Sequence, residues 1–262
     1  MITRVDRIIL TLTANPNYTG YWNFVSKVWR LKFGVIPTLV FNGTADELSS
    51  CGLSEQYGEI LRLDRVDDVT VNRQREWACT WSLFFAAASF PASVCMICGI
   101  DQVPLNGRFF DALRAEKAGD GAYVVGFADA YIVPNRFPSS HHVARGQTIK
   151  NVYKLEDSWP AEVRKVFALR DNYDQADDQW GLDESYSSHV LTDDPPCPVV
   201  FMRFFHPCWV GGRLDRGAHK LSQFDFTSIA RGQFTEWHGD RPFDATQEQQ
   251  DALFNAIPEY HW

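Results

Sequence analysis

Hydrophobic positions near the amino-terminal end of the chain switch twice between strand-like and helix-like spacing. Residues 7–13 form a β-rich apolar run that ends in the turn residues 14–17. Residues 18–33 then carry apolar side chains close to helical spacing, and Gly34 stands where a helix C-cap is expected. Residues 35–41 have the pattern of a second strand. A strand, a helix and a strand in this order predict a βαβ unit, for which a right-handed crossover is strongly favoured.

Strand and helix patterns continue along the rest of the chain. The predicted elements are a strand over residues 58–63, a mostly buried helix over 72–90, a strand over 94–100, a short helix over 109–117, a strand over 121–128, helices over 159–169 and 179–191, a strand over 199–205 and a helix over 246–256. Strands and helices alternate in the first half, which predicts a Rossmann-like α/β layer. The signals are mixed from residue 134 to residue 207, and the carboxyl-terminal third has few periodic runs.

One acidic residue follows the most apolar of these predicted strands. Residues 94–100 carry no charge, which is typical of a strand buried on both faces of a mostly parallel sheet. Asp101 stands at its carboxyl end, and residues 102–107 are predicted to turn the chain. Open α/β sheets bind ligands beyond the carboxyl ends of their strands, and a buried carboxylate needs a cation, a donor or water. Asp101 is therefore a candidate ligand for a metal that carries a phosphorylated substrate; a capping carboxylate in a turn is the alternative.

Composition narrows the class of partner. The chain has 262 residues, of which 45% are hydrophobic and 22% charged, as in an ordinary globular protein of one large domain. Its net charge is −8, and no run of Lys or Arg exceeds two residues, so we expect no nucleic-acid partner. A small anionic ligand remains possible because a metal and a few positioned cations can hold a diphosphate.

The cysteines, the amino-terminal residues and the apolar stretches indicate the cellular compartment of the protein. Cys95 and Cys98 have the spacing of half a zinc site, but both fall inside a predicted strand, where residues three apart point to opposite faces. Reduced, buried thiols are the better interpretation and suit the cytosol. The amino-terminal residues show no signal-peptide pattern, and the apolar stretch 77–94 is interrupted by polar residues and proline. We therefore expect a soluble cytoplasmic protein without a transmembrane segment; its oligomeric state is open.

Four segments, taken in order, resemble the nucleotide-diphospho-sugar transferases with the GT-A fold. The opening through residue 41 is similar to their first βαβ unit. Residues 99–105, Gly-Ile-Asp-Gln-Val-Pro-Leu, are similar to the Asp-x-Asp motif in its Asp-x-Asp-x-x-Pro-Leu form. Residues 179–184 resemble the Trp-x-x-Asp-Glu element near the acceptor, and residues 237–242 resemble the late His-x-x-Arg-Pro element that returns to the diphosphate. The similarity covers roughly residues 5–245.

This resemblance implies a fold and a domain plan. The fold is a three-layer α/β/α GT-A fold, Rossmann-like, around a central sheet that is mixed but mostly parallel. A single domain would span residues 1–262, with residues 1–133 as the nucleotide-binding half. Residues 134–262 would form the acceptor-side half and a carboxyl-terminal elaboration. The implied activity is the metal-assisted transfer of a sugar from a nucleotide-diphosphate sugar to an unknown acceptor (glycan, protein or small molecule).

The resemblance also implies site residues. Asp101 and His238 would hold Mn²⁺ or Mg²⁺, with diphosphate oxygens and waters completing an octahedron. The residues implied for binding the nucleotide sugar are Thr11, Thr13, Asn15, Tyr18, Arg75, Gly99, Gln102 and Arg241. Gly99 departs from the motif because the family has its first aspartate there. This loss should weaken metal or nucleotide binding, alter donor preference, or mark a non-catalytic relative that only binds nucleotide sugars.

Asp183 and Glu184 are the implied catalytic residues. Adjacent residues on a helix point about 100° apart, so only one of them can face a given spot. One could act as the catalytic base or bind acceptor hydroxyls, while the other caps or pairs; acidic residues that merely favour a helix N-terminus are the alternative. Two further polar clusters, His141–His142 and Asp215, Arg216 and His219, are weaker candidates for acceptor binding, since two adjacent His residues seldom ligate one metal. A nucleotidyltransferase is a third possibility, but the turn after the first strand lacks the Gly-rich basic loop that it needs.

Overall fold

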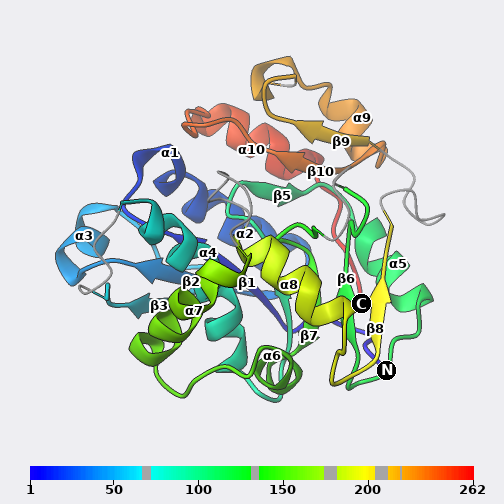
Figure 1. The fold of residues 1–262 in the computed structure, drawn as a ribbon. Coiled ribbons are helices and arrows are strands. Elements are labelled where there is room, and N and C mark those ends of the chain that lie inside the picture. Colours follow the sequence, from blue (N-terminus) through cyan, green and yellow to red (C-terminus); the bar gives the residue numbers. More distant parts are fainter. Residues whose placement is uncertain (67–71, 131–135, 174–181, 204–211, 219) are drawn as a thin grey trace.

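The computed structural model describes residues 1–66, 72–130, 136–173, 182–203, 212–218 and 220–262. Within these ranges, seven strands form one large sheet in the order β3-β2-β1-β4-β7-β6-β8 (Figure 1). They are β1 (Arg7–Leu12), β2 (Ile36–Asn42), β3 (Glu59–Leu63), β4 (Val94–Ile97), β6 (Tyr123–Val125), β7 (His142–Arg145) and β8 (Val199–Phe201). Among these strands only β7 runs opposite to the others, since it pairs antiparallel with both β4 and β6. The sheet is therefore mixed but mostly parallel.

Successive side chains of the central strands enter two separate cores. On β1, Ile8 and Leu10 belong to one core and Ile9 to the other, and all three are fully buried. On β4, Met96 and Ile97 divide in the same way. This two-residue alternation is the strand period, and apolar side chains on both faces mean that helices must cover both sides of the sheet.

Helices supply these two covering layers. The first core receives α2 (Tyr21–Lys32), α5 (Arg108–Ala115) and α10 (Gln247–Ala256). The second core receives α4 (Asn72–Ala88), α6 (Gly146–Tyr153), α7 (Trp159–Tyr173) and α8 (Leu182–Thr192). The shorter elements are α1 (Pro16–Thr19), α3 (Ala45–Ser50), the 3₁₀ turn Leu221–Gln223 and α9 (Phe226–Ala230). The result is the predicted three-layer α/β/α arrangement.

A second, three-stranded sheet stands at the edge of the first core (Figure 1). Its central strand β10 (Phe234–His238) pairs antiparallel with β5 (Gln102–Pro104) and parallel with β9 (Gly212–Asp215). Because β5 comes directly after the loop that carries Asp101, this small sheet brings the carboxyl-terminal part of the chain to the end of β4.

The structure corrects several predicted boundaries of helices and strands and adds elements that were not predicted. The predicted helix over residues 18–33 is two helices, with Gly20 between α1 and α2. The predicted turn over residues 102–107 begins as strand β5, which pairs with β10. Neither β7 nor α6 was predicted, and no strand was predicted where β10 lies. In the part of the chain that is described, no helix combines the length and apolar character needed to cross a membrane.

Candidate active site

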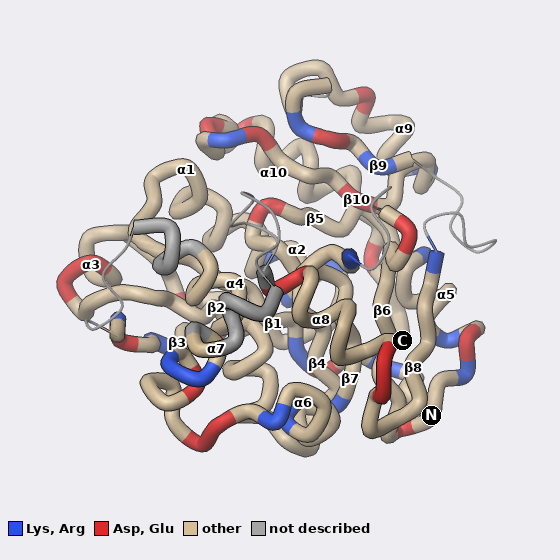
Figure 2. Tube along the Cα trace, viewed as in Figure 1, with Lys and Arg blue, Asp and Glu red and all other residues tan. Residues whose placement is uncertain are grey.

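A cavity of about 500 Å³ opens beyond the carboxyl ends of β1 and β4, where an α/β sheet is expected to bind ligands. This volume lies in the usual range for small-molecule sites. Ten predicted site residues line it: Thr11, Thr13, Asn15, Tyr18, Gly99, Asp101, Gln102, Glu184, His238 and Arg241. Segments from both ends of the sequence thus meet at one cavity. Figure 2 shows Lys and Arg of the described chain interspersed with Asp and Glu.

Asp101 lies at the centre of a cluster of cations. Its carboxylate is 7% exposed, and Oδ2 accepts hydrogen bonds from Arg216 Nη1 at 2.8 Å and from Arg241 Nε and Nη2 at 2.9 and 2.7 Å. His238 Nε2 lies 3.5 Å from the same oxygen. Burial alone would raise the pKa of Asp101, but His238 and Arg241 outweigh burial and hold the pKa well below its usual range. Asp101 is therefore ionised at neutral pH.

The small sheet explains how these cations reach Asp101. In its register His238 stands beside Asp215 on one side and Gln102 on the other. Asp215 ends β9, so Arg216 comes immediately after that strand, and Arg241 comes shortly after β10. The backbone N–H of Gly239 donates to the Asp101 carbonyl oxygen at 2.8 Å, which ties the two loops together. Carboxyl ends of parallel strands thus supply both arginines.

Gln102 fills the space that the missing first aspartate would need. Gln102 Oε1 accepts from the backbone N–H of Gly99 at 2.7 Å, and its Nε2 donates to Ser140 Oγ at 3.1 Å. A Cβ on Gly99 would lie 3.0 Å from both Asp101 Oδ1 and Gln102 Oε1, which is tighter than an ordinary contact. Gly99 therefore lines the cavity with its backbone alone, and the Gln102 side chain lines the cavity beside it.

Thr11 and Asn15, two of the residues implied for binding the nucleotide sugar, lie at the end of β1 and shortly after it. Thr11 Oγ1 lies within 3.2 Å of Asn42 Nδ2, Cys79 Sγ and Ser82 Oγ in a polar network between β1, β2 and α4. Asn15 caps α1 by accepting from the Asn17 N–H at 3.0 Å. Their binding roles stay predictions; the structure shows that both also have a structural function.

Tyr18 and Arg241 touch each other within the cavity wall. The guanidinium carbon of Arg241 lies 4.4 Å from the centre of the Tyr18 ring. A cation over an aromatic face is attracted by the ring quadrupole and is held in a defined plane. Arg241 is thereby fixed both by the Tyr18 ring and by the Asp101 carboxylate.

The two candidate catalytic residues occupy different positions. Glu184 lines the cavity, and Arg136 Nε donates to its Oε2 at 2.6 Å. Asp183 is 1% exposed and accepts a hydrogen bond from Ser139 Oγ, so it lies behind the lining residue Ser139. Burial, with Glu184 as a second cause, raises the pKa of Asp183 to about 7. The divergence expected of adjacent helical residues is observed, and the catalytic assignments stay predictions.

The residues around Asp101 do not fit a divalent cation. Mn²⁺ and Mg²⁺ need about six oxygen ligands, whereas Asp101 Oδ2 already accepts three guanidinium hydrogen bonds. The adjacent carboxylate, Asp215, ion-pairs with His238 Nδ1 at 3.2 Å and with Arg213 Nε at 3.1 Å. Two guanidinium charges would repel a cation from this place. The Asp101–His238 metal site therefore stays a prediction, and the residues around Asp101 disfavour it.

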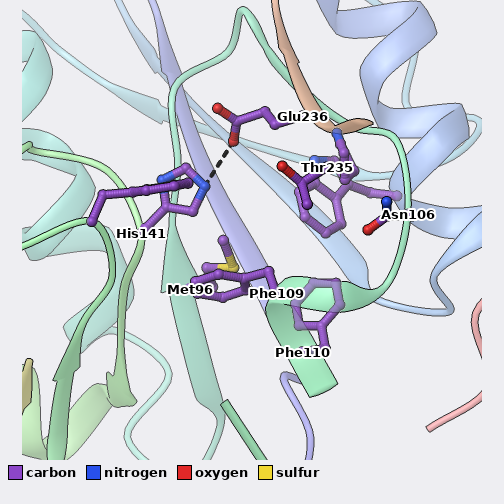
Figure 3. A pocket seen from close by; sticks show the side chains of 10 residues that line it. Met96, Asn106, Phe109, Phe110, His141, Thr235 and Glu236 are labelled. Atoms are coloured by element: carbon purple, nitrogen blue, oxygen red, sulfur yellow. Dashed lines mark ion pairs between the residues drawn. The ribbon is translucent and has the colours of Figure 1, made fainter. Parts of the chain in front are cut away.

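A separate group of possible ligands lies deeper in the protein. Cys98, His141 and Glu236 are buried, with ligand atoms within 4.8 Å of one another. His141 Nε2 is ion-paired with Glu236 Oε2 at 2.7 Å, beside a void of about 20 Å³ lined in part by Met96 and Phe109 (Figure 3). Arg213 Nε lies 3.2 Å from the other Glu236 oxygen, so the Glu236 carboxylate already has a guanidinium partner.

Sequence reasoning missed part of the cation cluster. Arg213 and Arg216 both line the cavity, but only Arg216 had been noticed, as a possible acceptor contact. The available signal was a basic residue on each side of Asp215 late in the chain. His219 and residues 179–181 lie outside the described residues, as does the side chain of Arg75; its backbone belongs to α4.

Comparison with known proteins supports the fold. No protein-family profile matches the chain, and no curated protein matches it in sequence. Among solved structures, the chain is similar to the galactosyltransferase LgtC in complex with donor and acceptor sugar analogues (TM-score 0.51, 10% identity, 97% of each chain covered). It is also similar to the glycosyltransferase GlyE of Streptococcus pneumoniae TIGR4 (TM-score 0.50, 8% identity), covering 97% of this chain and 60% of that one. The chain therefore has a GT-A-like glycosyltransferase fold.

Proposed function

We propose that this protein is a glycosyltransferase that moves a sugar from a nucleotide-diphosphate sugar to an acceptor hydroxyl. The observation that carries the proposal is the convergence of four separate segments on one cavity at the carboxyl edge of a GT-A-like sheet. Asp101, Glu184, His238 and Arg241 all line this cavity. The likeness to LgtC, solved with donor and acceptor sugar analogues, supports the same class of substrates.

The cavity offers groups for each part of the reaction. The bond between the anomeric carbon and the diphosphate oxygen breaks, and its electron pair stays on the departing diphosphate. The acceptor oxygen forms the new bond to that carbon and gives its proton to a base, for which we propose the Glu184 carboxylate. Cations that border the cavity stabilise the developing negative charge, and such preorganised groups usually give the largest single contribution to catalysis.

A non-catalytic nucleotide-sugar binder is the second candidate. It is favoured by Gly99, which replaces the first aspartate of the motif, and by Gln102, which occupies the space of that side chain. Such a protein would bind a nucleotide sugar in the same cavity without turning it over.

The experiment is a thermal-shift and calorimetry panel of UDP, GDP, ADP, CDP and TDP with representative sugars. We expect one nucleotide to raise the melting temperature and its sugar conjugate to be hydrolysed slowly by water, with Glu184→Gln reducing hydrolysis more than binding. Binding without release of sugar, even with a panel of glycan, peptide and small-molecule acceptors, would favour the non-catalytic binder. Failure of every nucleotide to bind at millimolar concentration would contradict both candidates.

A further inference from the structure

At the position of Asp101, the accessible charged groups are two guanidinium groups and not a free carboxylate. Arg216 and Arg241 both direct their donors to Oδ2 of this residue, at 2.7 to 2.9 Å. Each guanidinium side chain is 34% exposed, whereas the carboxylate is 7% exposed. The group that a ligand in the cavity meets at this place is therefore cationic. We call Asp101, Arg216 and Arg241 the arginine clamp.

Both guanidinium groups keep donors for a ligand. A guanidinium has five N–H donors in a planar fork. Arg216 uses Nη1 on Asp101, and Arg241 uses Nε and Nη2, so Arg216 Nε and Nη2 and Arg241 Nη1 are not used in the clamp. Both residues line the cavity, and each side chain is 34% exposed, so their guanidinium groups are accessible to a ligand there. Planar forks of this kind match phosphate oxygens and can bind two at once.

The charge count favours an anion. The clamp holds one carboxylate and two guanidinium groups, which leaves a net charge of +1. Arg213 also lines the cavity, but the carboxylates of Asp215 and Glu184 line it too, so the surplus of positive charge is confined to the clamp. A carboxylate that two guanidinium groups already neutralise attracts Mn²⁺ or Mg²⁺ only weakly, because these two positive charges repel a dication at the same place. The same surplus of positive charge attracts a diphosphate.

We propose that Arg216 and Arg241, oriented by Asp101, bind the diphosphate of the nucleotide sugar and stabilise its charge when it departs, in place of a divalent cation. This inference rests on the proposed function. The two arginines receive the negative charge that appears when the sugar–oxygen bond breaks, while the acceptor proton goes to the base as described above. Asp101 is a positioning residue, since it contacts the arginines and not the diphosphate.

The first experiment measures binding of the nucleotide diphosphate found by the panel, once in EDTA and once in Mn²⁺. We expect the dissociation constants to agree within about threefold, and binding in EDTA to weaken with added salt because the contact is ionic. Binding that requires Mn²⁺ would overturn the clamp and leave the glycosyltransferase proposal standing. Absence of binding in both conditions would overturn the proposed function itself.

The second experiment removes the donors one at a time. Hydrogen bonds from charged donors contribute enough that Arg216→Gln and Arg241→Gln should each weaken binding in EDTA by roughly ten- to a hundredfold. Arg231→Gln is the matched control, because Arg231 is exposed at the end of α9 and does not line the cavity. Circular dichroism verifies that each variant is folded. Unchanged affinity in both folded cavity variants would overturn the proposal.

Variants of Asp101 separate positioning from metal binding. Asp101→Asn keeps an oxygen that can accept guanidinium hydrogen bonds but loses the negative charge, so it should weaken binding in EDTA less than Asp101→Ala does. Asp101→Ala loses that oxygen and should weaken binding by about tenfold. A metal ligand would behave differently, since loss of the negative charge alone would abolish binding. Equal loss of binding in both variants would contradict the positioning role.

Discussion

Two buried aspartates beside the same cavity have pKa values shifted in opposite directions. Asp101 is 5% exposed and Asp183 is 1% exposed, so burial disfavours the charge of both. The pKa of Asp101 nevertheless lies well below its usual range because His238 and Arg241 stabilise the carboxylate. Among the described residues, no Lys, Arg or His forms an ion pair with Asp183, and burial with the adjacent Glu184 raises its pKa to about 7.

This contrast shows that the partner, and not the residue type, determines what a buried carboxylate can do. His238 and Arg241 keep Asp101 ionised, and its carboxylate in turn fixes Arg216 and Arg241 at the cavity. Ser139 gives Asp183 a single hydroxyl donor, so Asp183 exchanges its proton near neutral pH. Asp101 therefore provides a fixed charge at the cavity, whereas Asp183, behind Ser139, provides a group that titrates.

The largest effect is expected from removing the cations of Asp101. Arg216→Gln combined with Arg241→Gln leaves a buried carboxylate without its two guanidinium partners. This should lower the free energy of unfolding by about 3 kcal/mol, the low end for a buried pair, because both guanidinium groups are partly exposed and His238 remains beside Asp101. Urea unfolding measures the loss. Adding Asp101→Asn to the double variant should recover more than half of it, because the uncompensated charge is then gone. A double variant as stable as the wild type would contradict the claim that the two arginines stabilise the Asp101 carboxylate.

A second, smaller effect tests the other aspartate. A raised pKa stabilises the fold fully below the pKa of the unfolded chain, about 4, and this stabilisation is lost as the pH rises through about 7. Asp183→Asn does not titrate and keeps an oxygen for Ser139. Its stability relative to the wild type should therefore increase by about 2 kcal/mol between about pH 5 and pH 8.

Asp101→Asn is the matched control for this pH series. Because the pKa of Asp101 is lowered, its contribution is complete above the unfolded pKa of about 4 and is lost only in more acidic solution. The stability difference between Asp101→Asn and the wild type should thus be constant across the same pH window. Parallel pH profiles for the two variants would show that the two aspartates do not differ as described.

The sequence predicted the central layers well because their signals are local. The runs in β1, β2 and β4 and the helical spacing in α4 are visible in single stretches of the chain, and these elements were located to within a few residues. The three-stranded sheet was missed because its strands are short, and because Gln102 on β5 is polar and pairs with His238 in a distant segment. Pairing of this kind leaves no periodic pattern in either segment alone.

Candidate site residues were predicted by position more reliably than by role. Asp101 was expected beyond the end of its strand and lies there, but its partners Arg216 and Arg241 are 115 and 140 residues away in the sequence. A carboxylate at a sheet edge calls for a cation, and the sequence alone does not reveal whether that cation is a metal or a guanidinium. The structure supplies the guanidinium groups.

A third prediction asks whether Gly99 is required beside Asp101. Gly99→Asp would put a Cβ 3.0 Å from Asp101 Oδ1 and Gln102 Oε1 and add a second carboxylate. We expect a loss of about 1 kcal/mol in the free energy of unfolding, as for other overpacked sites. Gly99→Ala adds the Cβ without the charge, so a smaller loss in that variant would separate crowding from repulsion. Full stability of Gly99→Asp would show that the clamp has room for the family's first aspartate.

The smallest effect is expected from removing metal ions. Ligands that bind only the folded state raise the melting temperature, so a resident cation would be revealed by a fall on dialysis against EDTA. We expect no measurable change, because Asp101 is bonded to two arginines and Glu236 is ion-paired with His141. Cys98→Ser and Asp101→Asn locate any exception. A fall in melting temperature that disappears in Cys98→Ser would assign an ion to the cluster of Cys98, His141 and Glu236 and would not affect the arginine clamp. A fall that disappears in Asp101→Asn would instead assign a metal ion to Asp101, and would contradict the described difference between the two aspartates.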